Sequence, residues 1–242
     1  MDRNEVLKTE IEKIGIQLDD LQVKQFLMYY ELLVEWNKVM NLTAITEYKQ
    51  VVEKHFVDSI SLIHVLDKQY LDDNKSMIDI GTGAGFPGIP LKIVFPNLRV
   101  TLLDSLNKRI TFLNEVIKKL KLENIETIHG RAEDYARQIK YREQYDICVS
   151  RAVANLATLS EYCLPYTKEK GFFISYKSDH VDEEIENSKN AIKILGGKIE
   201  KIERFILPDT DIKRAIIKIK KERLTEKKYP RKAGMPSKEP LK

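Results

Sequence analysis

The chain has 242 residues, of which 43% are hydrophobic and 32% charged, and its formal net charge is +4. These values are typical of a globular protein with one large domain, or a core domain with an appendage. No apolar run approaches the roughly 18 residues of a membrane span, and the N-terminus lacks the apolar segment of a secretory signal. Two cysteines (Cys148, Cys163) and four isolated histidines form no metal-ligand pattern. We therefore expect a cytoplasmic protein with reduced thiols, no metal and no membrane contact.

Residues 1–75 are predicted to form an N-terminal helical extension. Apolar residues recur at spacings of three and four from Leu21 to Val34, behind an acid at position 19 or 20 that suits a helix N-cap. A second stripe of this kind runs from Val51 to Leu66, and residues 72–75 form the connector to the next segment.

Residues 76–222 are predicted to alternate strand and helix. Ser105 is expected to cap one of the helices. Two closing strands, joined by a loop that contains a proline, are expected to be antiparallel. Repeated β-α units predict an α/β fold with a mainly parallel sheet, helices on both faces and ligands at the carboxyl ends of the strands. The expected strands are 77–80, 99–103, 124–128, 145–149, 172–176, 198–205 and 214–220.

The segment at residues 77–90, M-I-D-I-G-T-G-A-G-F-P-G-I-P, predicts a nucleotide-binding turn after the first strand. Glycine lets the backbone turn sharply and bring its N–H groups close to a ligand. Gly83, Gly85 and Gly88 match the G-x-G-x-x-G of dinucleotide-binding folds, so an NAD-linked oxidoreductase is one alternative. Asp79 favours S-adenosylmethionine (AdoMet) instead, because a carboxylate repels a pyrophosphate but attracts an ammonium and a sulfonium.

The predicted fold class is therefore a Rossmann-like, class I AdoMet-dependent methyltransferase. Its closing antiparallel strand pair is a departure from the dehydrogenases. The methyltransferase domain is expected to cover residues 76–222, with residues 223–242 as a basic C-terminal tail.

Four strand ends supply the candidate site residues. Asp79 and Gly81 stand at the carboxyl end of the first strand. Asp104 ends the second strand and can accept the two ribose hydroxyls, with helix capping as its alternative role. Ala132 and Glu133 follow the third strand, where an adenine would lie, and Glu133 could equally be a solvated loop acid. Arg151 follows the fourth, where donor and acceptor meet, with a surface salt bridge as its alternative.

The fourth strand also indicates the kind of acceptor. Enzymes that methylate exocyclic amines of bases usually carry N-P-P-Y there, and this chain has S-R-A-V. Pyrimidine-carbon methylation needs a cysteine after a proline, which neither cysteine satisfies. A ring nitrogen with a free lone pair, such as guanine N7, needs neither feature and no general base, so alignment of donor and acceptor carries the reaction.

The C-terminal end is strongly basic. From Lys213 to Lys242 there are 12 Lys/Arg against 3 Asp/Glu, while the first 212 residues are net negative. The segment from Tyr229 to Pro236 mixes an aromatic and two prolines with cations. It therefore predicts a shaped loop docking on a nucleic-acid backbone, with a solvated lysine-rich end as the alternative.

These motifs resemble the RsmG (GidB) family of ribosomal RNA small-subunit methyltransferases. The resemblance runs from residue 41 to the tail. It rests on I-D-I-G-T-G-A-G-F-P-G-I-P-L and on N-L-T-A-I, H-F-V-D-S, L-L-D-S, R-A-E, S-R-A and Y-P-R-K-A-G. Ser178 and Met235 depart from the family pattern, outside the cofactor motif.

The resemblance implies AdoMet-dependent methylation of guanine N7 in 16S rRNA, on free rRNA or within the small ribosomal subunit. It implies that Gly81 and Phe86 line the cofactor site. Gly83 of the glycine turn is also expected to bind the cofactor. The resemblance also implies that Asp104 holds the ribose, Ala132 and Glu133 meet the adenosine, and Arg151 lies beside the methionine end. We expect a monomer. A non-catalytic RNA-binding assembly factor is a further alternative, because the basic tail and the lack of an obligatory base would fit it.

Overall fold

The structure, a computed structural model, describes residues 2–151 and 154–241. Ala152 and Val153, which follow Arg151 in the S-R-A-V segment, lie outside the described residues. A seven-stranded sheet has the order β3-β2-β1-β4-β5-β7-β6, in which β1 to β5 pair in parallel and β7 is antiparallel to both of its neighbours. The predicted sheet is confirmed. The strands are β1 (Ser76–Ile80), β2 (Arg99–Asp104), β3 (Ile125–His129), β4 (Tyr145–Arg151), β5 (Thr167–Ser178), β6 (Gly197–Ile206) and β7 (Lys213–Lys221).

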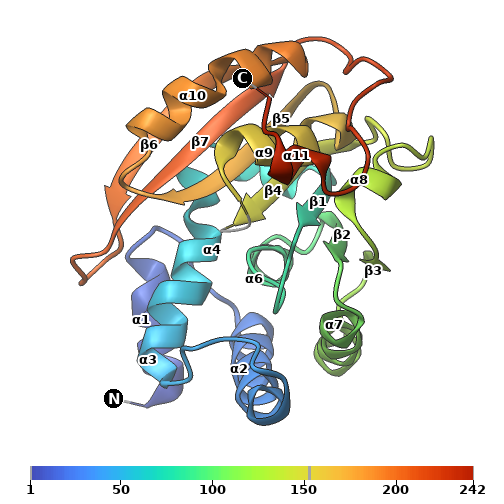
Figure 1. Ribbon diagram of the computed structural model, residues 1–242. Coiled ribbons are helices and arrows are strands. Elements are labelled where there is room, and N and C mark those ends of the chain that lie inside the picture. Colours follow the sequence, from blue (N-terminus) through green and yellow to red (C-terminus); the bar gives the residue numbers. More distant parts are fainter. Residues whose placement is uncertain (1, 152–153, 242) are drawn as a thin grey trace.

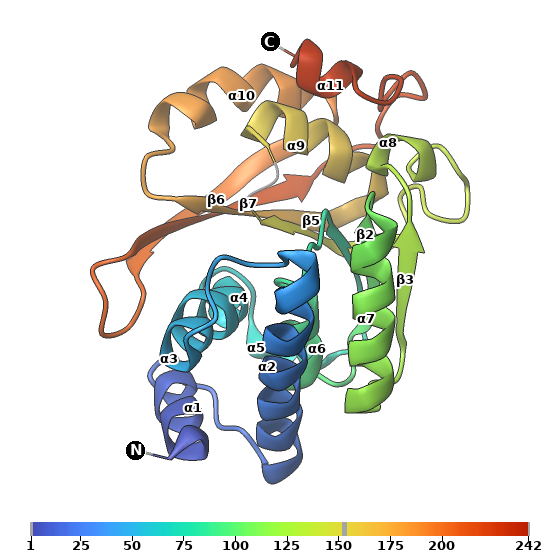
Figure 2. The same cartoon turned by 60° about the horizontal axis from the view of Figure 1, so that its bottom comes forward.

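Successive residues of each strand point to opposite faces of the sheet, and both faces are buried (Figure 2). Met77 and Val149 face a core shared with the N-terminal helices, while Ile78 and Cys148 face a second core under the C-terminal helices. The first layer consists of α1 (Arg3–Glu12), α2 (Asp20–Met40), α3 (Tyr48–Val51), the π-helical η1 (Val52–Val57), α4 (Asp58–Ile60), the 3-10 helix η2 (Ser61–His64), α5 (Lys68–Asp72), α6 (Gly88–Val94) and α7 (Asn107–Leu120).

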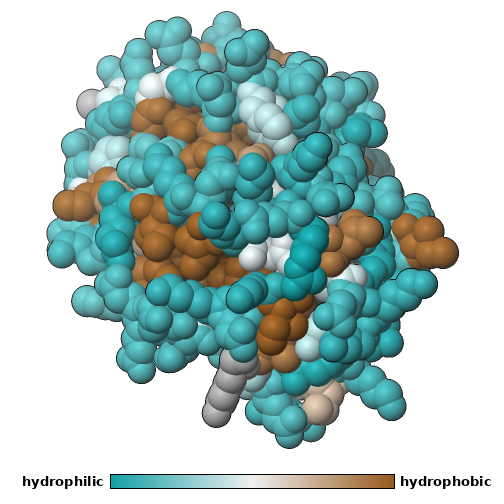
Figure 3. Space-filling model, turned by 90° about the horizontal axis from the view of Figure 1, so that it is seen from above, coloured by the Kyte–Doolittle hydropathy of each residue, from teal (hydrophilic) through white to brown (hydrophobic). Residues whose placement is uncertain are grey.

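The opposite layer closes with the chain's own C-terminus. Figure 1 shows the last segment running past α8 and α9 to end near α10. Seen from above in Figure 3, the surface is mainly hydrophilic, and polar groups separate its apolar areas. The elements of this layer are α8 (Ala132–Tyr135), α9 (Leu156–Cys163), the 3-10 helix η3 (Leu164–Tyr166), α10 (Asp182–Ile194) and α11 (Met235–Lys238).

Two helix starts illustrate how local sequence fixes the elements. Asp19 caps α2 through a reciprocal pair of hydrogen bonds with Gln22, as predicted. The prediction that Ser105 caps α7 is wrong: Leu106 occupies the N-cap position without a side-chain cap, and its N–H is held by Asp104. The strand-end acid has taken the role expected of the serine.

Candidate functional site

The glycine turn after β1 forms the floor of the site. Gly81, Gly83 and Gly85 all have positive φ, which side chains with a Cβ rarely adopt. A Cβ built on Gly83 would meet no atom within 4 Å, so its backbone faces open space. A Cβ on Gly88 would instead lie 2.4 Å from Leu102 and 3.0 Å from Asp79, because this glycine packs α6 closely against the sheet. The turn is thus open on one side and tightly packed on the other.

Asp79 lies beneath this turn and not on its open side. Its Oδ2 accepts hydrogen bonds from the Thr82 hydroxyl (2.7 Å) and the Gly88 N–H (2.9 Å), while Oδ1 has no partner among the described residues. The side chain is fully buried, and this burial raises the pKa of the carboxyl to about 7. Asp79 therefore organises the turn from below.

Asp104 connects the turn to the end of β2. Its Oδ2 accepts from the Gly83 N–H at 2.9 Å, and its Oδ1 accepts from the Leu106 N–H at 2.9 Å. Arg109 pairs with the same carboxylate at 3.1 Å. The acid predicted to hold a ribose thus already fixes the glycine turn.

Three side chains, those of His55, Phe86 and Arg151, stack beside the turn. The His55 ring lies on Phe86 with 4.6 Å between ring centroids, and the Arg151 guanidinium carbon lies 5.0 Å from the Phe86 centroid. Thr43 contacts His55 Nε2 through its hydroxyl at 2.9 Å. Burial, and then the charge of Arg151, lowers the pKa of His55 to about 3, so the imidazole is neutral near pH 7.

The N-terminal helices supply an acid to this stack. Asp58 accepts from Arg151 Nη1 at 2.9 Å and from Arg214 Nε at 3.0 Å. The stack comes from η1, the glycine turn and β4, and Asp58 of α4 joins it to Arg214 of β7, so the site combines segments that lie far apart in the sequence.

Two cavities meet at His55 and Arg151. The first, of about 440 Å³, lies over the glycine turn. The second, of about 520 Å³, extends from the same two side chains towards Asp58, Lys177 and Arg214. Of the predicted site residues, the first cavity brings together Gly81, Gly83, Phe86, Asp104 and Arg151.

Sequence reasoning gave no site role to Thr43, His55 or Arg109, which also line the first cavity. The N-L-T-A-I and H-F-V-D-S motifs were the only signal for the first two. His55 also stands within a helical apolar stripe, where a histidine usually packs as a core residue.

Three predicted residues are not on the wall of the first cavity. Asp79 lies below it, and Ala132 and Glu133 are buried at the start of α8. The Ala132 carbonyl accepts from the Tyr166 hydroxyl at 2.6 Å, and Glu133 Oε1 accepts from the Gly234 N–H at 2.7 Å. The Glu133 carboxylate is therefore engaged with the C-terminal tail.

The tail itself is docked on the protein. Arg231 forms a two-pronged ion pair with the fully buried Glu161, with contacts down to 2.7 Å. Arg142 donates to the carbonyls of Thr225 and Tyr229. The shape predicted for the segment from Tyr229 to Pro236 is thus created by contacts within the chain, which engage its arginine.

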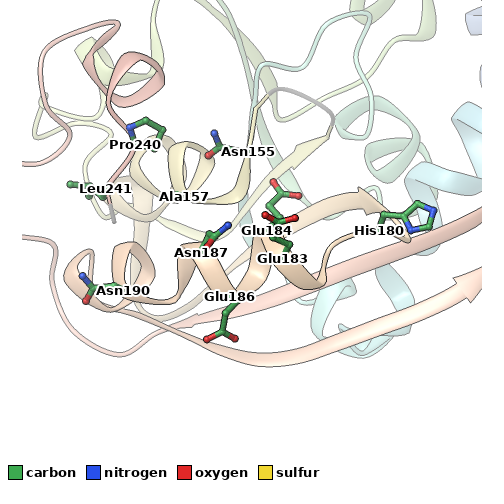
Figure 4. A pocket seen from close by; sticks show the side chains of 10 residues that line it. All are labelled: Asn155, Ala157, His180, Glu183, Glu184, Glu186, Asn187, Asn190, Pro240 and Leu241. Atoms are coloured by element: carbon green, nitrogen blue, oxygen red, sulfur yellow. The ribbon is translucent and has the colours of Figure 1, made fainter.

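A larger cavity than these two, of about 840 Å³, lies elsewhere, between α9, α10 and the chain end (Figure 4). Asn155, Asn187 and Pro240 surround it, and Glu184 lines the second cavity as well. None of the predicted site residues lines it. Size alone therefore does not identify the site.

The described residues contain no group of three or more His, Cys, Asp and Glu side chains that could hold a metal ion. Within residues 2–151 and 154–241, no helix is long and apolar enough to cross a membrane.

The sheet order, the glycine turn after β1 and the acid at the end of β2 define a Rossmann-like AdoMet-dependent methyltransferase. Solved structures share this fold. TYW2 of M. jannaschii in complex with AdoMet gives a TM-score of 0.51 at 18% identity, over 64% of this chain and 74% of that one. A sarcosine dimethylglycine methyltransferase from Galdieria sulphuraria gives 0.53 at 12% identity, over 68% and 84%.

The chain belongs to the rRNA small subunit methyltransferase G (GidB) family, whose sequence model matches residues 22–213. A relative of that name in Lachnoclostridium phytofermentans is 56% identical, covering 96% of this chain and 94% of its own. Another in Alkaliphilus metalliredigens is 52% identical over the full length of both. The predicted family, fold class, cofactor and enzyme class, an AdoMet-dependent rRNA methyltransferase, are confirmed.

Proposed function

We propose that this protein methylates N7 of one guanine in 16S rRNA, as a monomer acting in the cytoplasm, where ribosomes are assembled. The pair of cavities that meet at His55 and Arg151 carries the proposal. A methyl donor in the cavity over the glycine turn and an acceptor base in the other would face each other across these two side chains.

The first cavity fits AdoMet in size and chemistry. Its volume of about 440 Å³ lies within the usual range of small-molecule sites, about 300–1,000 Å³. The open side of Gly83 allows a ligand to approach the backbone closely. Asp104 on the cavity wall is a carboxylate that can accept ribose hydroxyls.

We assign the donor contacts as follows. Asp104 would accept the ribose hydroxyls, with Arg109 giving way, since the half-buried Arg109 side chain can move more easily than the Gly83 backbone. Gly81 and Gly83 would offer backbone groups, with Phe86 beside them. Arg151 would lie at the methionine end.

At the adenosine end, Ala132 and Glu133 would act through their backbone. The Glu133 carboxylate is held by Gly234, so its side chain serves the architecture of this end. Asp79 would act indirectly, by fixing the turn.

The chemistry asks little proton transfer of the protein. AdoMet supplies a methyl group already activated on a sulfonium, and guanine N7 has a lone pair and loses no proton when it attacks. His55 is neutral near pH 7 with its ring packed on Phe86, and Asp58 is engaged by two guanidinium groups. These residues are suited to positioning the reactants and excluding water, which is what the reaction requires.

We propose that the tail contacts RNA through fewer of its basic residues than the sequence suggested. Arg231 is engaged with Glu161, whereas Lys227, Lys228 and Lys232 are exposed. These lysines would bind rRNA phosphates, and such binding weakens as salt rises. The helical extension (1–75), the methyltransferase domain (76–222) and the tail (223–242) would then each contribute to the complex.

The test is to map N7-methylguanine in rRNA from a strain that lacks this protein. Naked 16S rRNA and small subunits are incubated with AdoMet and the purified protein, then cleaved with borohydride and aniline. We expect one new cleavage site that requires the protein. Asp104→Ala should strongly reduce cleavage there when AdoMet is below saturation, and Asp146→Asn, at the opposite end of the sheet, should retain it. Methyl transfer without N7 cleavage would contradict the proposed position, and no transfer would contradict the proposed substrate.

A further inference from the structure

Asp58 is a buried carboxylate whose side chain joins three parts of the fold. It begins α4, and its side chain is only 5% exposed. Its Oδ2 accepts from Arg151 at the end of β4, and its Oδ1 accepts from Arg214 on β7. Each oxygen therefore holds one guanidinium.

Arg151 is fixed from two directions as a result. Its Nη1 donates to Asp58 at 2.9 Å and to the Lys54 carbonyl at 3.3 Å. Phe86 supports the guanidinium from one side, with 5.0 Å between its centroid and the guanidinium carbon. A long, flexible side chain is thereby held in one orientation where the two cavities meet.

The charges make this restraint necessary. Arg151 and Arg214 both line the second cavity, and Asp58 is the carboxylate that engages them there. Without it, two guanidinium groups would repel each other, and Arg151 would also face a cationic methyl donor unopposed. A guanidinium in that position would move away from the boundary.

We infer that Asp58 is a positioning residue for methyl transfer, acting by holding the Arg151 guanidinium at the boundary between donor and acceptor cavities. The inference rests on the proposed function of these cavities. Asp58 lines the second cavity but not the first. Its loss should therefore slow transfer while leaving donor binding largely unchanged.

The first experiment compares Asp58→Asn with wild type in single-turnover methylation of rRNA at saturating AdoMet. The expected rate falls by about 10- to 100-fold, the scale on which a misplaced group affects a reaction. The dissociation constant of S-adenosylhomocysteine, measured by calorimetry, should change by less than about threefold. Asp146→Asn is the matched control, because Asp146 lies on the same strand as Arg151, at its other end, and pairs with Lys168.

The second experiment separates positioning from a general structural role. Asp58→Asn is made again in an Arg151→Gln background. If Asp58 acts through Arg151, the additional loss of rate should be less than about threefold, because residues that act as one unit are not additive. A loss as large as in the wild-type background would overturn the inference, as would an Asp58→Asn protein as fast as wild type.

Arg151→Lys covers the case in which Asp58→Asn does not fold. Lysine keeps the positive charge but cannot reproduce the planar fork of arginine. We expect its transfer rate to fall as far as that of Asp58→Asn, and a wild-type rate would overturn the inference. Absence of transfer by the wild type itself would instead contradict the proposed function, so the two failures can be told apart.

Discussion

Arg231→Met tests whether the tail is docked in solution as in the structure. Glu161 on α9 is fully buried, and both of its oxygens accept from the Arg231 guanidinium: Oε1 from Nε at 3.0 Å and Oε2 from Nη2 at 2.7 Å. Its Oε1 also accepts from the Arg231 backbone N–H at 2.7 Å. Methionine preserves much of the apolar stem but removes the guanidinium. The substitution leaves a buried carboxylate with its charge uncompensated.

The expected loss of stability follows from the burial of the Glu161 carboxylate. Breaking a buried ion pair by removing one partner costs about 3–5 kcal/mol, because the remaining charge stays desolvated. For a chain of this size, 1 kcal/mol corresponds to about 2–4 °C in the melting temperature. We therefore expect a decrease of roughly 6–20 °C.

The assay is equilibrium urea unfolding, followed by circular dichroism, with thermal melting in parallel. Lys228→Met is the matched control: Lys228 is in the same tail, but its side chain is 64% exposed, and the expected change is within about 0.5 kcal/mol. Glu161→Leu combined with Arg231→Met should recover much of the loss, since no charge is left buried. A cost below about 1 kcal/mol for Arg231→Met would refute the docked tail.

Three further predictions concern the site. Asp104→Ala should weaken AdoMet binding about 10- to 100-fold in calorimetry, since hydrogen bonds to a charged acceptor are lost, and unchanged affinity would contradict its assigned role. Burial raises the pKa of Asp79 to about 7 from 3.8, so the fold favours the protonated acid. The resulting stabilisation is complete below about pH 4 and is lost as pH rises through about 7, and urea titrations of wild type against Asp79→Asn should show this difference. Burial lowers the pKa of His55 to about 3, so stability should fall as pH drops below about 6.5; a His55→Phe variant should lack this contribution, and an identical pH profile would contradict it.

The sheet could be predicted because its signals are local. Alternating or continuous apolar runs mark the strands, and the first two runs end directly at Gly81 and at Asp104. Asp79, Asp104 and Arg151 were placed at the correct edge for this reason, since the carboxyl ends of parallel strands meet there. The error at Ser105 is of the same local kind, because two neighbouring residues could both cap the helix.

The partners of the charged residues could not be predicted. Glu133 meets Gly234 across 101 positions, and Asp58 meets Arg151 across 93. A chain with 41 basic and 37 acidic residues offers too many possible pairs for composition to select one. Tertiary packing selects the pairs, and it places the Glu133 carboxylate against Gly234 of the tail and not on the cavity wall.

Part of the site comes from the N-terminal helices and not from the sheet. Its glycine turn and strand-end acids belong to the sheet, but Thr43, His55 and Asp58 come from residues before β1. The π-helical turn of η1 widens the helix where His55 lies against Phe86, and Asp58 follows it directly. A regular α-helix would place these side chains differently relative to each other, because the π-turn shifts their register. Residues before β1 therefore complete the boundary between the two cavities. Under the proposed function, the sheet alone would hold the methyl donor without orienting Arg151 towards the acceptor.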